Sequence, residues 1–501
     1  MARDWTRRQL LGQAGQMGLA AGLAGLGLAA CGEPGQLAPA APQADSGADG
    51  LEHFITRPDL TPPVTTVTRH GLGSDSRLTF LNAPWSGTGR GGSAIRDAAG
   101  GLIWFGPNTE SRHRMDVGTQ LYRGKPVLTW WQGVVTAEGY GLGDCVIADS
   151  AYRVRHTIRA HHGLQADLHE FRLTAEGTAL ITAYRRRPAN LSAVGGPADG
   201  WVLSGVVQEI DVATGDLVFE WDSLDHVPVT ESAKAYAGET RASPFNYFHI
   251  NSIAVAADGT LLISSRNTWT VYKVARPSGR VIWRLGGKRS DFARGRGTRF
   301  YWQHHARPHS SRTLTLFDNG ADPAQESRSR ALILDLDTDR MRVTLRQAFA
   351  HPGRRLLSGA MGSAQLLPGG RMFVGWGTLP YYSEFAADGS LLADGQITDT
   401  CQSYRAFSHE WTGHPAEPPV VAARPRQGGG SQVYASWNGA TEVASWTVLT
   451  GRSASSLAAA GHFRRSGFET AMTVHHRGSH VAVEARNAAG HVLGRSAAIE
   501  V

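Results

Sequence analysis

Residues 257–263, with the sequence ADGTLLI, contain the pattern that decides the fold: a tight turn at Asp258-Gly259 leads into a short apolar strand. Asp-Gly between β-prone runs is typical of a hairpin turn. The same unit recurs in 96–104 (RDAAGGLIW), 174–181 (TAEGTALI), 211–218 (DVATGDLV), 277–283 (PSGRVIW) and 368–373 (PGGRMF). Such hairpins in series, grouping into strand quartets about every 40–50 residues, are typical of propeller blades. We therefore expect an all-β chain whose residues 64–415 form a β-propeller of six or seven blades, of which we take six.

Composition agrees with this fold and limits the classes of molecule that the chain is expected to bind. The chain has 501 residues with 60 Gly and 23 Pro, 41% of its residues are hydrophobic and 19% are charged, which is a turn-rich globular composition. The formal net charge of +7 is spread along the chain, and the longest basic run is Arg185-Arg186-Arg187. This distribution argues against nucleic acid as a partner. It favours a basic pocket for a small anion.

The first thirty residues predict export. Residues 6–11, TRRQLL, resemble a twin-arginine export motif, and a Gly/Ala-rich apolar stretch follows and ends at Ala29-Ala30-Cys31. This ending resembles a lipobox, in which the cysteine is lipidated and becomes the mature N-terminus. We expect residues 1–30 to be a lipoprotein signal peptide and residues 31–63, rich in Ala, Pro and Gly, to be a flexible tether lipidated at Cys31. The domain would then be anchored by its lipid to the outer face of the cytoplasmic membrane.

The sequence pattern changes in the C-terminal part of the chain. Residues 415–419, PAEPP, interrupt the hairpin pattern, and the segments 433–440 (VYASWNGA), 445–449 (SWTVL) and 481–490 (VAVEARNAAG) resemble strands of a fibronectin type III domain. The length of about 80 residues fits one β-sandwich. We expect residues 418–501 to form a fibronectin type III-like β-sandwich that serves as a support or binding module.

Three histidine segments lie far apart in the sequence, as expected for groups that meet at one mouth of a propeller channel. They are 167–171 (DLHEF), 248–252 (FHINS) and 301–307 (YWQHHAR). His249 and Asn251 would face one side of a strand, and Arg266 follows one hairpin later. These groups could bind an anion between them. A single histidine in an apolar strand is more often structural, and that is the role we expect for His169.

Five short segments carry a family resemblance: 249–253 (HINSI), 262–266 (LISSR), 302–304 (WQH), 316–320 (LFDNG) and 329–330 (SR). Together and in this order they resemble the arylsulfate sulfotransferase family. The segments 128–133 (LTWWQG), 207–211 (VQEID) and 282–288 (IWRLGGK) resemble its branch common in actinobacteria and fungi. The resemblance covers roughly residues 90–415 and leaves out the C-terminal domain.

The resemblance implies transfer of a sulfuryl group from an aryl sulfate to a phenol, without a soluble nucleotide donor. We expect no cofactor and identify no metal-binding residues in the sequence. It implies that His249 and His304 are catalytic and that Arg330 clamps the sulfate. Arginine suits this role because it binds oxyanions bidentately. The substrate-binding residues that we expect beside them are Asn251, Arg266, His305, Asn319 and Trp376, the last by stacking on the aryl ring.

One departure leaves the chemistry open. The family's transiently sulfated histidine lies in a segment that best matches residues 374–383, VGWGTLPYYS, which contain no histidine. His304 or His305 could act as the nucleophile instead, transfer could be direct between two substrates, or the activity could be lost. The rival interpretation is a non-catalytic extracellular propeller that binds an anionic or aromatic ligand or a cell-wall polymer. A glycan hydrolase or lyase fits less well, because no carboxylate pair is evident near His249 or His304.

Overall fold

The structure is a computed structural model that describes residues 49–71, 77–83, 91–398 and 401–501. The described residues form strands joined by turns, with four 3-10 turns at Ser192–Val194, Ser223–Asp225, Val229–Glu231 and Pro368–Gly370 and no α-helix. The expected all-β fold is thus confirmed. Within these ranges no helix is long and apolar enough to cross a bilayer.

The described part of residues 65–409 forms five sheets built from consecutive hairpins, antiparallel except for the parallel pair of β17 and β21. The first contains β2 (Leu78–Ala83), β3 (Gly92–Arg96), β4 (Leu102–Pro107) and, beside β2, the late strand β26 (Ala406–His409). The second has eight strands: β5 (His113–Tyr122), β6 (Lys125–Val135), β7 (Gly141–Ala148), β8 (Val154–Ile158), β9 (Ala166–Leu173), β10 (Thr178–Ala189), β11 (Gly200–Asp211) and β12 (Leu217–Asp222). Only the pair Gly143 and Ala166 joins β7 to β9, so this sheet consists of two meanders of four strands.

Three further sheets complete this region. One contains β13 (Ile250–Val255), β14 (Leu261–Ser265), β15 (Thr270–Val274) and β16 (Val281–Gly286). The next contains β17 (Ala293–Arg294), β18 (His304–Ser310), β19 (Thr313–Asp318), β20 (Arg330–Asp337) and β21 (Arg342–Phe349). The last contains β22 (Ser363–Leu366), β23 (Met372–Gly375), β24 (Tyr381–Phe385), β25 (Leu391–Ile397) and the early strand β1 (Thr65–Arg69).

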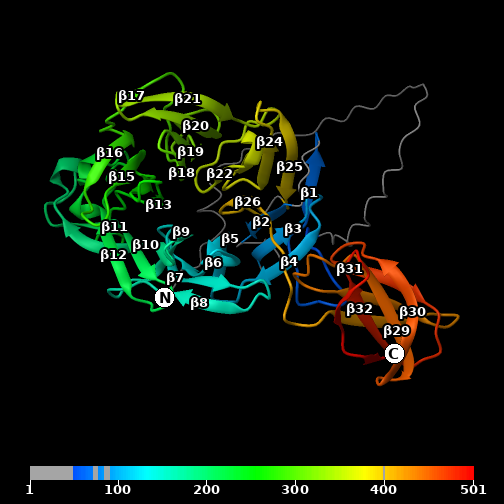
Figure 1. Ribbon diagram of the computed structural model, residues 1–501. Coiled ribbons are helices and arrows are strands. Elements are labelled where there is room, and N and C mark those ends of the chain that lie inside the picture. Colours follow the sequence, from blue (N-terminus) through cyan, green and yellow to red (C-terminus); the bar gives the residue numbers. More distant parts are fainter. Residues whose placement is uncertain (1–48, 72–76, 84–90, 399–400) are drawn as a thin grey trace, which may run out of the picture. The chain divides into compact units, whose positions relative to one another are not determined.

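The sheets follow one another around a common centre, which makes this region a β-propeller (Figure 1). The strands β5, β9, β13, β18, β22 and β26 lie nearest to that centre. The ring is closed by pairing between distant parts of the chain, because β26 pairs with β2 and β1 pairs with β25. Side chains at the inner strands are therefore brought together from segments that are far apart in the sequence.

The turn that opened the sequence argument forms as expected. Val255 pairs with Leu261 across it, and Gly259 has a φ of 77°, which a residue with a side chain rarely adopts. Asp258 Oδ1 accepts hydrogen bonds from both the N–H and the hydroxyl of Thr260. The hairpin between β13 and β14 is thus fixed locally, by the residues of the turn itself.

The C-terminal region folds as two sheets. One contains β27 (Val420–Pro425), β28 (Ser431–Ser436) and β31 (Glu469–Val474), and the other contains β29 (Ser445–Ser453), β30 (Ser456–Arg464), β32 (His480–Arg486), β33 (Val492–Arg495) and β34 (Ile499–Glu500). Val433 and Met472 of the first sheet share a core with Trp446 and Val483 of the second. Burial of apolar side chains between the sheets is what stabilises this region.

The expected flexible tether does not extend to residue 63. Glu52 forms a buried ion pair with Arg96 at 2.6 Å, and the Phe54 and Leu60 side chains are buried. Thr56 donates its backbone N–H to Glu469 at 2.6 Å. The segment from residue 51 onward therefore packs as part of the fold, whereas the predicted signal peptide, Cys31 and the first part of the tether lie outside the described residues.

Two smaller observations concern the cysteines and the charge. Cys145 is a buried free thiol, so the pairing with Cys401 that the sequence allows is not formed. Burial raises the pKa of the Cys145 thiol, which makes it unreactive.

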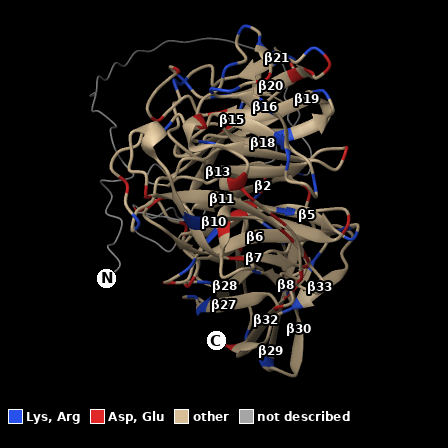
Figure 2. Ribbon diagram, turned by 90° about the vertical axis from the view of Figure 1, so that its left-hand side faces the viewer, with Lys and Arg blue, Asp and Glu red and all other residues tan. Residues whose placement is uncertain are grey.

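Figure 2 shows Lys and Arg interspersed with Asp and Glu along the described strands. This mixing agrees with the sequence, which has no long basic run.

Candidate active site

The inner strands bring three histidines from the three predicted segments together. His169 lies on β9, His249 directly precedes β13, and His304 begins β18. The His169 and His249 ring centroids are 4.8 Å apart and the rings are nearly perpendicular, at 80°. Burial lowers the pKa of His249, and its ionisable neighbours His169, Arg266 and His304 lower it further. We call His169, His249, Arg266 and His304 the histidine cluster.

The backbone around this cluster is strained. Ten non-glycine residues of the described chain have a positive φ, and four of them belong to the segments of the cluster: His249 (52°), Trp269 (54°), Trp302 (57°) and His305 (53°). Such conformations cost of order 1–3 kcal/mol each and gather at active sites and ligand clamps. The strain marks this end of the inner strands as a functional site.

His169 is held by a buried carboxylate. Asp167 Oδ2 accepts the His169 Nδ1–H at 2.8 Å, and Asp167 Oδ1 accepts the Gly141 N–H at 2.6 Å. Thr182 donates its hydroxyl to Asp167 Oδ2 at 2.9 Å. With the proton on Nδ1, the lone pair of His169 lies on Nε2, which has no hydrogen-bond partner among the described residues. An aspartate that orients a histidine in this way prepares it as a base or nucleophile.

His249 has the opposite tautomer from His169. Asn246 Nδ2 donates to His249 Nδ1 at 3.0 Å, so the proton of the neutral ring lies on Nε2. Burial, followed by the charges of His169 and Arg266, holds the pKa of His249 well below its usual range. His249 therefore stays neutral at neutral pH and offers an N–H to the cluster.

Both ring nitrogens of His304 are already engaged. His304 Nδ1 faces two acceptors, Asn319 Oδ1 at 2.7 Å and Trp302 O at 3.1 Å, so it carries the proton. His304 Nε2 accepts the Met361 N–H at 3.2 Å. Burial and the charge of Arg266 hold its pKa well below the usual range. His304 is thus locked in one neutral form, with Asn319 as its positioning residue.

Arg266 is the cation of the cluster. It donates to Asn267 Oδ1 at 3.1 Å and to Gly359 O at 2.9 Å, and its guanidinium lies 4.8 Å from the Trp302 ring centroid. No carboxylate lies within ion-pair distance of it in the described part of the chain, and burial lowers its pKa to about 10. A buried arginine without a carboxylate favours an anionic ligand.

Several buried polar atoms around the cluster lack a partner. They are Asn246 Oδ1, Asn251 Oδ1, Arg266 Nε, Trp269 Nε1 and Gln303 Oε1, which are half of such atoms in the described residues. Unpaired buried polar groups are costly and rare in native proteins. Their concentration at one place is expected where a bound molecule or ordered water completes the hydrogen bonds.

A buried arginine supports the cluster from within the channel. Arg405 donates to the main-chain oxygens of His169 at 2.8 Å and Asn251 at 2.9 Å. It forms ion pairs with Asp116 at 3.1 Å and Glu170 at 3.2 Å. The residue thereby ties β9 and β13 to one another, which fixes the relative positions of His169 and His249.

Three residues that the sequence predicted for the site lie elsewhere. Arg330 pairs with Asp318 at 3.0 Å and Glu326 at 3.2 Å, so its guanidinium is taken by carboxylates and is not available to clamp a sulfate. Trp376 is fully buried and donates to Ser383 Oγ, so its ring packs in the core instead of facing a substrate. His305 points away from His304, into a cavity lined by Arg307 and Phe407.

Other predicted residues are near the cluster. Asn251 donates to Gln303 O at 2.6 Å and Asn319 holds His304, so both act on the cluster's geometry. His169 was expected to be structural, although the sequence contains a signal for its pairing. Residues two apart in a strand face the same side, so Asp167 and His169 can form a hydrogen bond.

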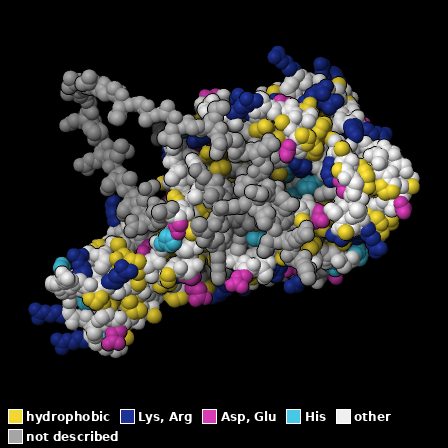
Figure 3. Space-filling model, turned by 180° about the vertical axis from the view of Figure 1, so that it is seen from behind, with side chains coloured by type: hydrophobic (Ala, Val, Ile, Leu, Met, Phe, Trp, Pro, Cys, Tyr) yellow, Lys and Arg dark blue, Asp and Glu magenta, His cyan; other side chains and the backbone are white. Residues whose placement is uncertain are grey.

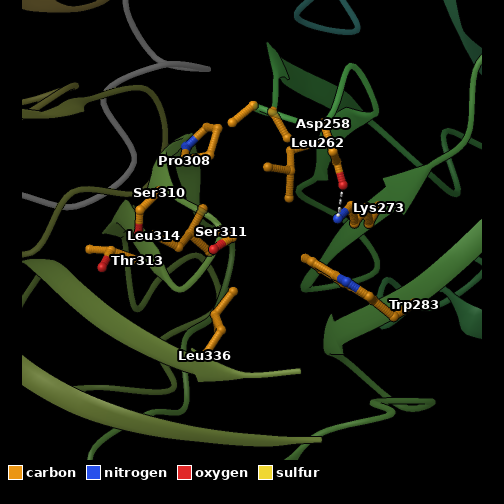
Figure 4. Close-up of a pocket in the computed structure, with 12 residues that line it drawn as sticks. Asp258, Leu262, Lys273, Trp283, Pro308, Ser310, Ser311, Thr313, Leu314 and Leu336 are labelled. Atoms are coloured by element: carbon orange, nitrogen blue, oxygen red, sulfur yellow. Dashed lines mark hydrogen bonds and ion pairs between the residues drawn. The ribbon is translucent and has the colours of Figure 1, made fainter. Parts of the chain in front are cut away.

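A separate cavity of about 260 Å³ lies between β14–β16 and β18–β19 (Figure 4). Leu262, Trp283 and Leu336 line it, and its charged groups, Asp258 and Lys273, neutralise one another in an ion pair at 2.6 Å. Its only charged side chains among the lining residues are therefore neutralised. Figure 3 shows, on the face seen from behind, histidine side chains in a hollow bordered by apolar and basic side chains.

Comparison with solved structures finds distant likenesses. They include a protein of unknown function from Bacteroides caccae (10% identity, 67% of this chain and 100% of that chain, TM-score 0.40). A protein from Lactobacillus plantarum has 15% identity, 80% and 100% coverage and a TM-score of 0.35. A catalytically inactive virginiamycin B lyase from Staphylococcus aureus has 8% identity, 75% and 96% coverage and a TM-score of 0.34. These similarities are too low to carry an argument.

No curated protein matches the chain. The family model described as arylsulfotransferase (ASST), by contrast, matches residues 118–397, which is more than half of the sequence. The matched region contains all four members of the histidine cluster together with Asp167 and Asn319. The chain therefore belongs to the arylsulfotransferase family.

Proposed function

We propose that this chain transfers a sulfuryl group from an aryl sulfate ester to a phenolic acceptor at the histidine cluster. The observation that carries the proposal is the pairing of two features. The His169 Nδ1–H is held by Asp167, while its Nε2 has no hydrogen-bond partner among the described residues, and Arg266 is a buried cation with no carboxylate of those residues within ion-pair distance. A nucleophile next to an anion ligand is what sulfuryl transfer requires.

In the proposed first step, His169 Nε2 attacks the sulfur of the bound aryl sulfate. The N–S bond forms as the S–O bond to the ring breaks, and the aryl oxide leaves as an anion. Asp167 stabilises the positive charge that develops on the imidazole. In the second step a phenol loses its proton to solvent and its oxygen attacks the same sulfur, so the N–S bond breaks and His169 is regenerated.

Arg266 and His249 stabilise the negative charge that develops on oxygen atoms during these steps. The Arg266 guanidinium holds sulfuryl oxygens, because arginine binds such groups with parallel hydrogen bonds. The His249 Nε2–H donates to the departing oxygen and remains neutral throughout. Donors that are already aimed at developing charge are worth about 2.7–4 kcal/mol each in comparable sites. His304 and Asn319 support the geometry without exchanging protons.

The wider organisation is also a proposal. We propose six blades, counting the eight-stranded sheet as two, and a fibronectin type III-like fold for residues 418–501. We further propose export through the twin-arginine route and lipidation at Cys31, with the propeller displayed outside the cytoplasmic membrane. The C31S variant of the full chain should then be released from membranes on centrifugation, whereas the unchanged chain should sediment with them.

The activity is tested by nitrophenolate release from 4-nitrophenyl sulfate, with and without added phenol. We expect release that rises with phenol concentration, that is abolished in His169→Ala, and that is unchanged in His162→Ala, a histidine more than half exposed on the surface. No release with any of a panel of phenols would contradict the proposal. Binding of 4-nitrophenyl sulfate without turnover would then favour the non-catalytic propeller.

A further inference from the structure

A second polar cavity lies further along the same inner strands. It has a volume of about 320 Å³ and is lined by residues of β5, β6, β9, β18, β22 and β26. On β9 the chain passes from His169 of the histidine cluster to Arg172 of this cavity, and on β18 it passes from His304 to Arg307. This volume is within the range of small-molecule sites. We call it the Arg172 cavity.

Charged and polar side chains from several inner strands line the Arg172 cavity. Glu170 and Arg172 contribute from β9, Arg307 contributes from β18, and His409 contributes from β26, which Arg405 directly precedes. The polar lining is thus formed by residues of strands that are far apart in the sequence.

The charges around the cavity do not cancel. Glu170 pairs with Arg307 at 2.6 Å and with Arg405 at 3.2 Å, and Asp116 pairs with Arg405 at 3.1 Å. Burial alone would raise the pKa of Glu170, but the charges of Arg307, Arg405 and Arg172 hold it below its usual value. Glu170 therefore stays ionised, and three arginines face two carboxylates.

Arg172 carries the excess charge. In the described part of the chain it has no carboxylate within ion-pair distance and makes no side-chain hydrogen bond. Its charge nevertheless acts on its neighbours, because it contributes to the lowered pKa values of His305 and His409. A half-buried guanidinium with five free N–H donors needs an acceptor, and the two carboxylates present are already engaged.

The remaining wall fits an aromatic ring. Phe407 lines the cavity, and its ring centroid lies 5.4 Å from that of His409. Burial and the charges of Arg77 and Arg172 lower the pKa of His409 to about 3. His409 is therefore neutral, and it can donate an N–H to an oxyanion without adding a charge.

We infer that the Arg172 cavity is a second anion-binding site of this propeller, distinct from the histidine cluster, and that it takes a small aromatic oxyanion through Arg172 and the Phe407 wall. The inference does not depend on the proposed transferase activity. It requires only that an aromatic anion bind at a place from which the reacting groups His169 and His249 are absent.

The test is calorimetric titration of the full chain with benzenesulfonate, which has an aromatic ring and an oxyanion but a C–S bond that cannot be transferred. We expect two molecules bound per chain. Arg172→Gln should lose one of them, with affinity at that site falling at least about tenfold, and Arg266→Gln should lose the other. Arg186→Gln, which removes the same charge from an exposed position on β10, should still bind two.

Arg172→Lys keeps the charge and should keep measurable binding, which separates a ligand role from damage to the fold. Two bound molecules in Arg172→Gln, or the same loss in Arg186→Gln, would overturn the inference. A single site that is lost in Arg266→Gln and kept in Arg172→Gln would overturn it as well. Absence of nitrophenolate release would refute the transferase proposal but leave the second site untouched.

Discussion

His169 and His304 lie on neighbouring parts of one channel and differ in what holds them. The Nδ1–H of His169 is held by the Asp167 carboxylate and its Nε2 has no partner in the described chain. The Nδ1–H of His304 is held by the Asn319 amide, and its Nε2 accepts the Met361 N–H. A carboxylate stabilises a positively charged imidazole, whereas an amide does not. In the proposed mechanism, hydrogen-bond partners, more than position, separate the reacting histidine from the supporting one.

The largest expected effect is on His169. The His169→Ala variant should lower kcat for nitrophenyl sulfate by at least about 10³-fold, because it removes the proposed nucleophile. His304→Gln should cost about 10–100-fold, through misplacement of its neighbours. Steady-state rates measured side by side at saturating phenol compare the two. A larger loss in His304→Gln would reverse the assignment.

The second largest effect is expected for the Asp167 carboxylate. Asp167→Asn should lower kcat by about 10²–10³-fold while changing KM little, because an amide can turn the ring to the other tautomer and cannot stabilise its charge. Asn319→Ala, the matched change beside His304, should have a smaller effect on kcat. Equal losses in the two variants would mean that Asp167 only positions its histidine.

A second contrast sets Arg266 against Arg330. Arg266→Gln should lower kcat/KM about 10²-fold, since it removes the anion ligand. It should also raise the pKa of His249 and His304, whose values are lowered in part by its charge. Arg330→Gln should leave kcat/KM nearly unchanged but reduce the free energy of unfolding by about 1–3 kcal/mol, because Asp318 loses its partner. Kinetics and urea unfolding of both variants would show whether these roles are exchanged.

Much of the fold could be predicted because its rules are local. The turn at Asp258-Gly259 depends on a glycine with positive φ and an aspartate that caps its own turn, and both are visible in the sequence. The closure by β1 and β26 is not local, since each pairs with a strand more than 300 residues away. The packing of residues 51–63 likewise depends on distant partners such as Glu469, so composition alone predicted a tether.

The site was predictable only in part, for the same reason. His249, Arg266 and His304 were predicted because each sits in a motif, and the structure brings them close together. Arg330 was misjudged because its partner, Asp318, stands opposite it in the register of β19 and β20, and that register cannot be read from the sequence. Trp376 was misjudged because its burial depends on neighbours from other strands.

The smallest expected effect concerns pH. Burial raises the pKa of Asp318 to about 6, despite the opposing charge of Arg330. The folded state therefore holds this proton more tightly than the unfolded chain, so its contribution to stability is present at low pH and is lost as pH rises through about 6. Between pH 4.5 and pH 7 the wild type should lose roughly 1–3 kcal/mol more unfolding free energy than Asp318→Asn. Parallel slopes for both chains would contradict this.

The most direct test of the account is to treat the full chain with an aryl sulfate in the absence of a phenol, quench it in alkali, and map the modified peptides by mass spectrometry. The account predicts a mass gain of one SO₃ group on the peptide that contains His169, and its disappearance when phenol is added before the quench. A gain on a peptide containing His304 or His305, or turnover with no modified peptide at any time, would contradict it.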